Sequence, residues 1–429
     1  MKIWIKLMVV LSMITGLAIL TGAGVESLAQ GEGIKLLIAG RDGTYGKAMQ
    51  LAVDAYLEEN PRADIELLKL PYAGLSEKVV IDLKEATGAY DVMMMDDTWV
   101  AGFAAAGWIA NLTEMFMERE LSLDPDFVGA AVDCARYPYL RGIASIYGLP
   151  HVGNVELFVY RKDLFDKYGL PSPPETWDEV LNAAKVIDEN ELDVHGVVFR
   201  GRKGNPINAG FLPIFWSFGA EVLDEEGNPT VNSPEAVAAL KFFLDLAEYA
   251  PEGVEIYDAS DVRDGLLSGS AAIATEVWPA WVPDLDNPEK SQVVGKIEVT
   301  VHPGQVTRSA PMIGIWHLAI PEASTRKDAA FDFLLFVTSE RMQKRMALEV
   351  GLPPTRASLY VDPEVVAKYR WYPDQLKALR ASKVRPRLPE WIEIDPKMGF
   401  YLNLALVGDR TPEEALNELN AEIADILGK

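Results

Sequence analysis

Between residues 34 and 107 the chain alternates short apolar segments with amphipathic ones, and this alternation restricts the possible folds most strongly. The apolar segments have the length and composition of buried strands, and the amphipathic segments carry apolar residues on one helical face. The predicted strands are 34–39, 64–70 and 90–95, and the predicted helices are 47–60 and 75–87. Strands and helices that alternate in this way form a parallel sheet covered by helices, so the fold class is α/β.

Polar side chains follow two of these predicted strands. Arg41 and Asp42 follow the first strand, and Asp96, Asp97 and Trp99 follow the third. Ligands of open α/β sheets bind outside the carboxyl ends of the strands, so we expect these side chains at one rim of a binding site. Asp96 and Asp97 are adjacent in extended chain and point to opposite sides, so one can face the site while the other caps the next helix.

Residues 147–165 indicate a change of lobe. The segment opens with Gly148 and Pro150, continues with strand-forming Val, Phe and Tyr residues, and precedes a second alternating series. A chain of 429 residues is too long for one ordinary core, so two lobes are expected. We predict that the segment crosses between the lobes beside a cleft. His151, just after the proline, is either a structural residue or a ligand contact.

Aromatic and planar polar side chains near predicted strand ends and loops suit a carbohydrate. The tryptophans are Trp99, Trp216, Trp278, Trp281 and Trp316, and the polar residues are Arg41, Asp96, Asp97, Asn154 and Arg356. An indole ring offers a broad face to the C–H groups of a sugar, and carboxylate, amide and guanidinium groups bond hydroxyls. Each tryptophan could equally be a core residue. Trp278 and Trp99 are the preferred stacking candidates because each directly follows a strand.

Sequence signatures of enzymes and metal sites are missing. Residues 40–47 have the wrong spacing for a phosphate loop, and no His-Glu-x-x-His or Gly-x-Ser-x-Gly motif occurs. Cys134 is the single cysteine, which excludes an internal disulfide and a Cys-based metal site. A formal net charge of −24 argues against nucleic acid as a partner. We therefore expect no catalytic residue, no metal and no cofactor.

The first 29 residues have the pattern of an export signal. Lys2 and Lys6 precede the apolar segment 7–20, and small residues at 27–29 suit a signal peptidase. We expect cleavage after Ala29 and a soluble periplasmic or extracellular protein. No cysteine follows the apolar segment, so the lipid-attachment pattern of bacterial lipoproteins is missing.

Several separated motifs resemble the family 1 extracellular solute-binding proteins of ABC importers, the maltose/trehalose-binding type. The motifs lie at 97–108, 160–165 (Tyr-Arg-Lys-Asp-Leu-Phe), 174–179 (Pro-Glu-Thr-Trp-Asp-Glu), 232–236, 277–280 (Val-Trp-Pro-Ala) and 351–356 (Gly-Leu-Pro-Pro-Thr-Arg). The resemblance covers nearly the whole mature chain. It implies a two-lobed periplasmic-binding-protein fold of type II, with mixed, mostly parallel sheets flanked by helices and a ligand cleft at a multi-stranded hinge.

The resemblance also implies bounds for the lobes and roles for single residues. Residues 30–149 plus 296–322 would form the N-terminal lobe, and 150–295 plus 323–429 the C-terminal lobe. Asp97 matches the acid that binds sugar hydroxyls, Trp278 the stacking tryptophan, and Arg356 the arginine of a Leu-Pro-x-x-Arg loop. The implied ligand-binding set is Arg41, Asp42, Asp96, Asp97, Trp99, His151, Asn154, Trp216, Trp278, Gly314, Trp316 and Arg356.

Three departures from the family pattern bear on ligand identity. Asn154 stands where relatives often have Asp, and Arg41 stands where they often have an acid. Ile315 replaces the second glycine of a Gly-Gly-Trp motif, next to Gly314 and Trp316.

The resemblance implies a monomeric binding protein without catalysis. It would capture a carbohydrate, a di- or oligosaccharide, by closure of its lobes and deliver it to the permease subunits of an ABC transporter. One alternative is another small polar solute, either a polyol or a glycerol-phosphate-like ligand, and convergence of Arg41 and Arg356 would favour an anion. The other alternative is a secreted carbohydrate-active enzyme, which would need two facing carboxylates in the cleft.

Overall fold

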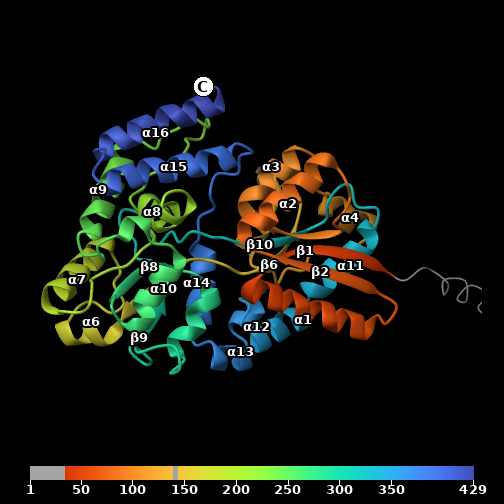
Figure 1. Cartoon of the computed structure of the whole chain (residues 1–429), viewed down its shortest axis with the longest axis horizontal. Coiled ribbons are helices and arrows are strands. Elements are labelled where there is room, and N and C mark those ends of the chain that lie inside the picture. Colours follow the sequence, from red (N-terminus) through yellow and green to blue (C-terminus); the bar gives the residue numbers. More distant parts are fainter. Residues whose placement is uncertain (1–33, 139–143) are drawn as a thin grey trace, which may run out of the picture.

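The computed structural model describes residues 34–138 and 144–429, which form two lobes lying side by side (Figure 1). The predicted leader at 1–29 lies outside the described residues. The first lobe contains a five-stranded sheet in the order β2-β1-β3-β10-β6. Its strands are β1 (Lys35–Arg41), β2 (Asp64–Leu70), β3 (Val92–Asp96), β6 (Leu149–Val152) and β10 (Trp316–Ala319). β1 pairs in parallel with β2 and β3, as predicted, whereas β10 is antiparallel to β3 and β6.

Helices from distant parts of the chain cover this sheet. They are α1 (Gly43–Glu59), α2 (Tyr72–Glu85), α3 (Val100–Ala105), α4 (Leu112–Glu118), α11 (Lys327–Val337) and α12 (Glu340–Val350). α11 and α12 contact α1, and Phe331 and Met346 share a hydrophobic core with Ile38 and Met94. This packing places 327–350 in the first lobe, although the predicted bounds gave 323–429 to the second. The chain returns through β10 and only a short turn separates β10 from α11, so α11 stays beside the first sheet.

The second lobe is built on a three-stranded sheet in the order β8-β7-β9, in which β7 is antiparallel to both neighbours. The strands are β7 (Leu157–Arg161), β8 (Ile273–Val277) and β9 (Ile297–Thr300). β9 therefore belongs to this sheet, although the predicted bounds put 296–322 in the first lobe. The predicted α/β class is confirmed, with parallel pairing confined to β1, β2 and β3 among the named strands of the described residues.

Helices surround the second sheet and supply most of the hydrophobic core of this lobe. They are α6 (Lys162–Tyr168), α7 (Trp177–Asn190), α8 (Asn205–Ser217), α9 (Pro234–Ala247), α10 (Ala259–Ser268), α15 (Trp391–Leu406) and α16 (Pro412–Leu427). α15 and α16 pack together at the upper edge of this lobe in Figure 1. The fully buried Trp177, Phe243 and Trp391 lie in one hydrophobic cluster. The shorter elements are α5 (Gly129–Asp133), α13 (Pro363–Lys368), α14 (Tyr372–Ala381), β4 (Arg136–Tyr137) and β5 (Ser145–Ile146).

Three chain segments lie side by side between the lobes. The predicted crossover 147–165 divides into β6 of the first sheet and β7 of the second, with the connecting residues between them. Val155 forms an antiparallel bridge with Ile313, and Met312 forms a parallel bridge with Lys383. Backbone hydrogen bonds from Gly314 N to Asn154 O (3.1 Å) and from Ile313 N to Lys383 O (3.2 Å) join the three segments. We call these segments, 153–156, 311–314 and 382–384, the hinge.

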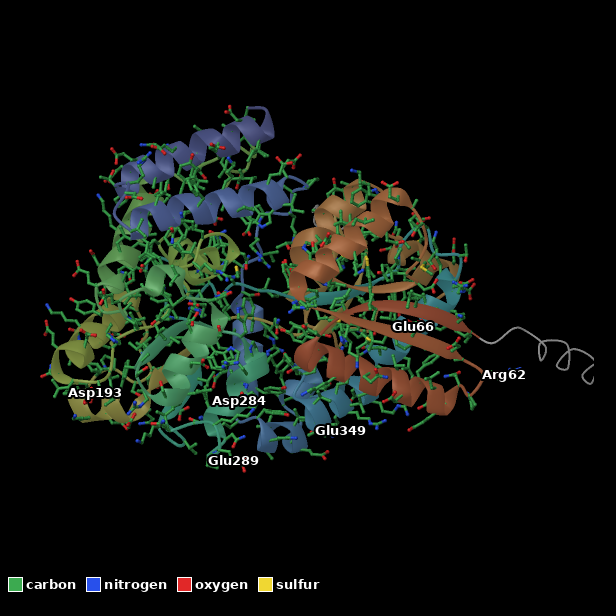
Figure 2. All side chains as sticks on the ribbon, viewed as in Figure 1. Arg62, Glu66, Asp193, Asp284, Glu289 and Glu349 are labelled. Atoms are coloured by element: carbon green, nitrogen blue, oxygen red, sulfur yellow. The ribbon has the colours of Figure 1, made fainter. Side chains whose placement is uncertain are left out.

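Charged side chains project from the outer faces of both lobes, as Asp193, Asp284, Glu289 and Glu349 illustrate (Figure 2). In the part of the chain that the structure describes, no helix is long and apolar enough to cross a membrane.

Candidate functional site

The carboxyl ends of two parallel strands meet at the cleft side of the first sheet. β1 ends at Arg41 and β3 ends at Asp96, and Trp316, the first residue of β10, is the register partner of Asp96. The sheet topology therefore brings Arg41, Asp96 and Trp316 to one edge. This is the rim that the strand order predicted.

Aromatic rings surround the Arg41 guanidinium at this rim. Its central carbon lies 5.0 Å from the ring centroid of Trp316, 5.3 Å from that of Tyr72 and 5.7 Å from that of Tyr45. Trp99 and Trp316 are each 5% exposed with centroids 5.7 Å apart, whereas Tyr72 is 44% exposed. The two indoles thus form a floor, which we call the aromatic floor, and Tyr72 stands at its edge. Tyr45 was missed because it does not directly follow a predicted strand, and Tyr72 because only the ends of the first and third strands were considered.

Asp96 and Asp97 differ in their surroundings, but not as their adjacency predicted, because Asp96 both caps the next helix and lies at the rim. Asp96 accepts a hydrogen bond from the Thr98 N–H (3.3 Å) and stays close to solvent, with 14% of its side chain exposed. Burial, together with the neighbouring Asp97 carboxylate, raises the pKa of Asp96 to about 6. Asp97 is buried and accepts from Arg385 Nη2 at 2.6 Å, and Arg387 Nη2 lies 3.5 Å away. Asp97 is therefore paired with two arginines, and Asp96 is the carboxyl group that lies at the rim.

The hinge supplies Asn154, and β6 supplies His151. Asn154 Nδ2 donates to the Tyr45 hydroxyl at 2.8 Å, which links the hinge to the aromatic floor. His151 is fully buried, and neither ring nitrogen has a hydrogen-bond partner in the described structure. Burial lowers the pKa of His151 to about 3, so the ring is neutral. This environment fits the structural alternative for His151.

Trp278 follows β8 and reaches the hinge. A Cβ atom at Gly314 would lie 2.8 Å from ring atoms Cη2 and Cζ3 of Trp278, so the indole packs against the glycine backbone. The central carbon of the Arg200 guanidinium lies 5.9 Å from the Trp278 ring centroid. Trp278 is only partly buried, unlike the core tryptophans of its lobe. Its position fits the predicted stacking role.

Three other predicted ligand residues have different surroundings. Trp216 lies on α8, is 2% exposed and belongs to the hydrophobic core of the second lobe. The Arg356 Nε donates to Thr338 O (2.8 Å), its Nη1 donates to Asp124 (2.6 Å), and its guanidinium covers the Phe127 ring. Arg356 is thus tied to the loop before α5 and does not converge with Arg41. Asp42 precedes α1, with 48% of its side chain exposed, and lies 3.8 Å from the Arg41 guanidinium.

Buried charges on the second-lobe side were not predicted. Arg200 Nε donates to Glu276 Oε1 at 3.3 Å, and Thr275 Oγ1 donates to Glu276 Oε2 at 3.0 Å. Burial raises the pKa of Glu276 to about 7, against the opposing effect of Arg200. Asn208 donates to Asp395 at 3.0 Å. A glutamate inside the otherwise uncharged β8 was the available sequence signal, because strands rarely bury an acid without a partner.

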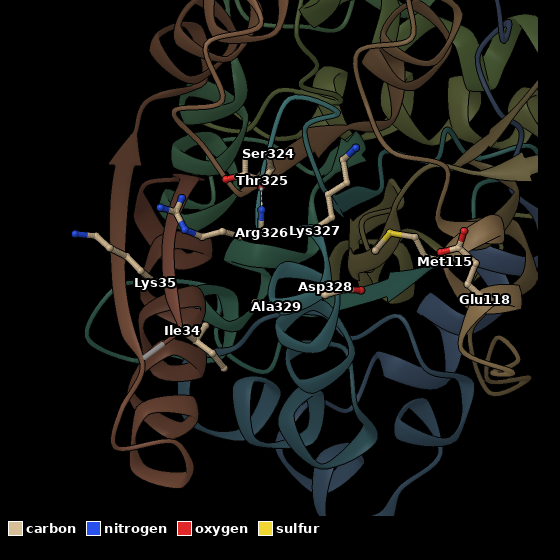
Figure 3. Close-up of a pocket in the computed structure, with 10 residues that line it drawn as sticks. All are labelled: Ile34, Lys35, Met115, Glu118, Ser324, Thr325, Arg326, Lys327, Asp328 and Ala329. Atoms are coloured by element: carbon tan, nitrogen blue, oxygen red, sulfur yellow. Dashed lines mark hydrogen bonds between the residues drawn. The ribbon is translucent and has the colours of Figure 1, made fainter. Parts of the chain in front are cut away.

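A surface pocket of about 840 Å³ lies at the opposite end of the first sheet (Figure 3). Ile34 and Lys35 at the start of β1 line it together with residues 324–329 before and at the start of α11. Ligands of such sheets bind at the carboxyl ends of the strands, whereas this pocket lies at the amino end of β1, so it is not the expected ligand site. Among the described residues, no group of three or more His, Cys, Asp or Glu could hold a metal ion.

The sequence and the fold match a known protein family. Residues 40–344 match the family described as bacterial extracellular solute-binding protein. The chain is similar to an ABC transporter solute-binding protein from Agrobacterium radiobacter in complex with ribitol, at 27% identity and a TM-score of 0.82, covering 92% of this chain and 99% of that one. It is similar to maltose-bound MalE3 of T. maritima at 30% identity and a TM-score of 0.81, covering 92% of this chain and 100% of that one.

A curated relative supports the same assignment. A probable amino-acid ABC transporter periplasmic-binding protein of Sinorhizobium fredii is 28% identical over 372 residues, which are 85% of this chain and 82% of the relative. These matches confirm the two-lobed periplasmic-binding-protein fold. The chain belongs to the family of bacterial extracellular solute-binding proteins.

Proposed function

We propose that this solute-binding protein captures a carbohydrate between its lobes and delivers it to the permease subunits of an ABC transporter. The supporting observation is a set of buried polar atoms in the first lobe, the hinge and the second lobe. Arg41 Nε, Asn154 Oδ1 and Asn208 Oδ1 are buried and have no hydrogen-bond partner within residues 34–138 and 144–429. The hydroxyl groups of a carbohydrate can accept a hydrogen bond from Arg41 Nε and donate hydrogen bonds to the two amide oxygens. Its C–H faces can stack on indole rings.

Closure of the lobes is the proposed mechanism. Arg41 belongs to the first lobe and Asn154 to the hinge, whereas Trp278 and Asn208 belong to the second lobe. A ligand that touches residues of both lobes therefore stabilises the closed arrangement. The protein does no chemistry in this scheme. The closed pair of lobes would be the form that the permease receives, outside the cytoplasm, after export directed by the predicted leader.

A linear polyol is the second candidate. The ribitol complex of the Agrobacterium radiobacter relative favours it, because that protein shares the fold over nearly its whole length. A di- or oligosaccharide remains our first prediction, since the exposed Tyr72 of the first lobe and the partly buried Trp278 of the second offer apolar ring faces. The amino-acid transporter name of the Sinorhizobium fredii relative makes an amino acid the natural comparison ligand.

The anionic and enzymatic alternatives have weaker support. Arg356 is bonded to Thr338 and Asp124, so it does not join Arg41 in a site for a phosphate group. Both carboxyl oxygens of Glu276 accept hydrogen bonds, Oε1 from Arg200 and Oε2 from Thr275, so neither oxygen is free to act on a glycosidic bond.

The test is a calorimetric titration of the mature protein against ribitol, mannitol, glucose, maltose and maltotriose, with glycerol 3-phosphate and glycine as comparison ligands. We expect micromolar binding, about −8 kcal/mol, for at least one saccharide or polyol. Tight binding of glycerol 3-phosphate or glycine alone would contradict the proposal. Release of product sugars from maltotriose would show an enzyme.

A further inference from the structure

Glu156 lies in the hinge, on the same side of the chain as Asn154. Its backbone N–H donates to Met312 O at 3.0 Å, which places it beside the second hinge segment. Side chains alternate along extended chain, so residues two apart share a side. Val155 and Leu157 enter a hydrophobic cluster, whereas Asn154 faces Tyr45 at the aromatic floor. Glu156 therefore points away from that cluster, toward the side of the ligand site.

No described residue donates a hydrogen bond to this carboxyl group. Glu156 is completely buried, and neither carboxyl oxygen accepts a hydrogen bond from any residue that the structure describes. The nearest cation is Arg200, whose Nη2 lies 4.0 Å from Glu156 Oε1. Arg200 Nε is bonded to Glu276 (3.3 Å) and Nη1 lies 3.8 Å from Asp258, so only Nη2 faces Glu156, beyond hydrogen-bond distance.

The charged groups around Glu156 come from three elements. They are Arg200, which precedes α8, Glu276 on β8, and Arg385 on the segment between α14 and α15. Arg385 is bonded to Asp97, and Glu276 is a second acid, so the two carboxyls share essentially one arginine. Burial raises the pKa of Glu156 well above its usual value, Arg200 opposes this shift, and Glu276 adds to it.

A buried carboxyl without a donor is far less costly as the neutral acid than as the ion. The neutral acid has one O–H donor and acceptor capacity on both oxygens. A hydroxyl group, which donates and accepts at the same time, satisfies that pattern. An anionic or purely apolar group does not.

We propose that Glu156 is a ligand contact at the hinge, where its neutral carboxylic acid exchanges hydrogen bonds with a hydroxyl group of the bound solute, so that capture weakens as pH rises. This inference rests on the proposed function. It names the residue that makes the site selective for neutral, hydroxyl-bearing solutes. It also makes solute capture strongest in mildly acidic surroundings.

The test compares Glu156→Gln and Glu156→Met with the wild type by calorimetry with maltose and ribitol at about pH 6 and about pH 9. Gln keeps a donor and an acceptor without a charge, so E156Q should bind within about threefold of the wild type at the lower pH. Met fills the space without hydrogen bonds, so E156M should bind the solute about tenfold more weakly or worse.

Glu276 and Asp96 also titrate near neutral pH, so the informative quantity is the difference in affinity between the wild type and E156Q. That difference should grow with pH, because the wild type alone loses affinity through Glu156.

Glu298→Gln is the matched control, because Glu298 lies on β9 with 42% of its side chain exposed, paired with Arg370. It should leave affinity and its pH dependence unchanged. Equal affinities of wild type, E156Q and E156M at both pH values would overturn the proposal. So would an E156Q variant that keeps the full pH dependence.

A ligand-free measurement separates this inference from the proposed function. The melting temperature of the wild type relative to E156Q should fall as pH rises above about 5, because only the folded wild type holds the extra proton. A constant difference would overturn the neutral-acid assignment, even if E156M fails to fold. If neither maltose nor ribitol nor any other saccharide or polyol binds, the proposed ligand class is wrong, and so is the proposed contact between Glu156 and a solute hydroxyl group. The melting comparison still decides the charge state of Glu156.

Discussion

The Trp278 ring lies directly on the backbone of Gly314, where a Cβ atom would come within 2.8 Å of two ring carbons. Trp278 follows a strand of the second lobe, and Gly314 belongs to the hinge and bonds Asn154 O. The contact therefore couples the position of the Trp278 ring, a candidate stacking surface, to the hinge. A glycine is required there because any side chain would occupy the volume of the indole.

We predict that Gly314→Ala displaces the Trp278 ring and weakens solute binding by about tenfold, since an added methyl group in a packed contact costs about 1–3 kcal/mol. Calorimetric titration with the tightest-binding saccharide or polyol of the panel measures the effect. Gly129→Ala is the control, because a Cβ atom there meets nothing within 4 Å. Unchanged affinity of G314A would show that the ring position does not matter for binding.

Trp278 and Trp216 should respond oppositely to truncation. Trp278→Ala removes a partly buried ring at the hinge, so we expect binding to be lost with a small change in melting temperature. Trp216→Ala opens a cavity in the second-lobe core, where Trp216 is 2% exposed, and should cost about 3–5 kcal/mol of unfolding free energy. Denaturant titrations and calorimetry on both variants separate the roles. A large stability loss in W278A would make Trp278 a core residue.

Local patterns predicted elements well and side-chain partners poorly. β2 has the predicted bounds, because the residue pattern of a strand is a signal within the segment itself. The aromatic run at 210–219 has no clear period because α8 is buried on nearly every side and contains Pro213.

The charged residues show the limit of sequence reasoning more directly. Asp97 is neutralised by Arg385, which lies 288 positions further along the chain. Whether an acid after a strand is free for a ligand depends on which distant segment folds beside it, and no local pattern contains that information. Glu156 was overlooked for the same reason, because its isolation becomes visible only when Arg200 is seen to be engaged by Glu276.

We predict that Asp97→Asn destabilises the protein by about 3–5 kcal/mol, because it leaves Arg387 buried without its acid and Arg385 with only Asp96, at 3.8 Å. The free energy of unfolding in urea measures the loss. Asp166→Asn serves as the control, since the Lys162–Asp166 pair is exposed and such helix pairs contribute about 0.3–0.5 kcal/mol. Loss of solute affinity in D97N without loss of stability would instead support the original prediction that Asp97 binds the sugar.

Arg356→Ala should affect stability and spare ligand affinity. The guanidinium donates to Thr338 O and Asp124 and covers Phe127, so its removal should cost about 1.5–3 kcal/mol. Affinity for the panel solute should stay within about twofold. If affinity falls strongly while the melting temperature holds, Arg356 reaches the ligand after all.

His151 should make the fold sensitive to acid. Burial lowers the pKa of His151 to about 3, whereas an unfolded chain has a histidine pKa of about 6.5. Between these values the unfolded state binds the additional proton, so stability falls as the pH falls, by about 1.4 kcal/mol per pH unit. Buried carboxyls with raised pKa values act in the opposite direction, and for that reason the comparison must be made against a variant.

The measurement is the unfolding free energy of the wild type minus that of His151→Leu, taken from about pH 7 down to about pH 5. The difference should decline by about 2 kcal/mol over this range, because only the wild type must keep a neutral ring inside β6. His195→Leu is the control, because 47% of that side chain is exposed and its Nδ1 lies 3.6 Å from Asp188. A flat difference for H151L would mean that water or a rearranged partner reaches the His151 ring in solution.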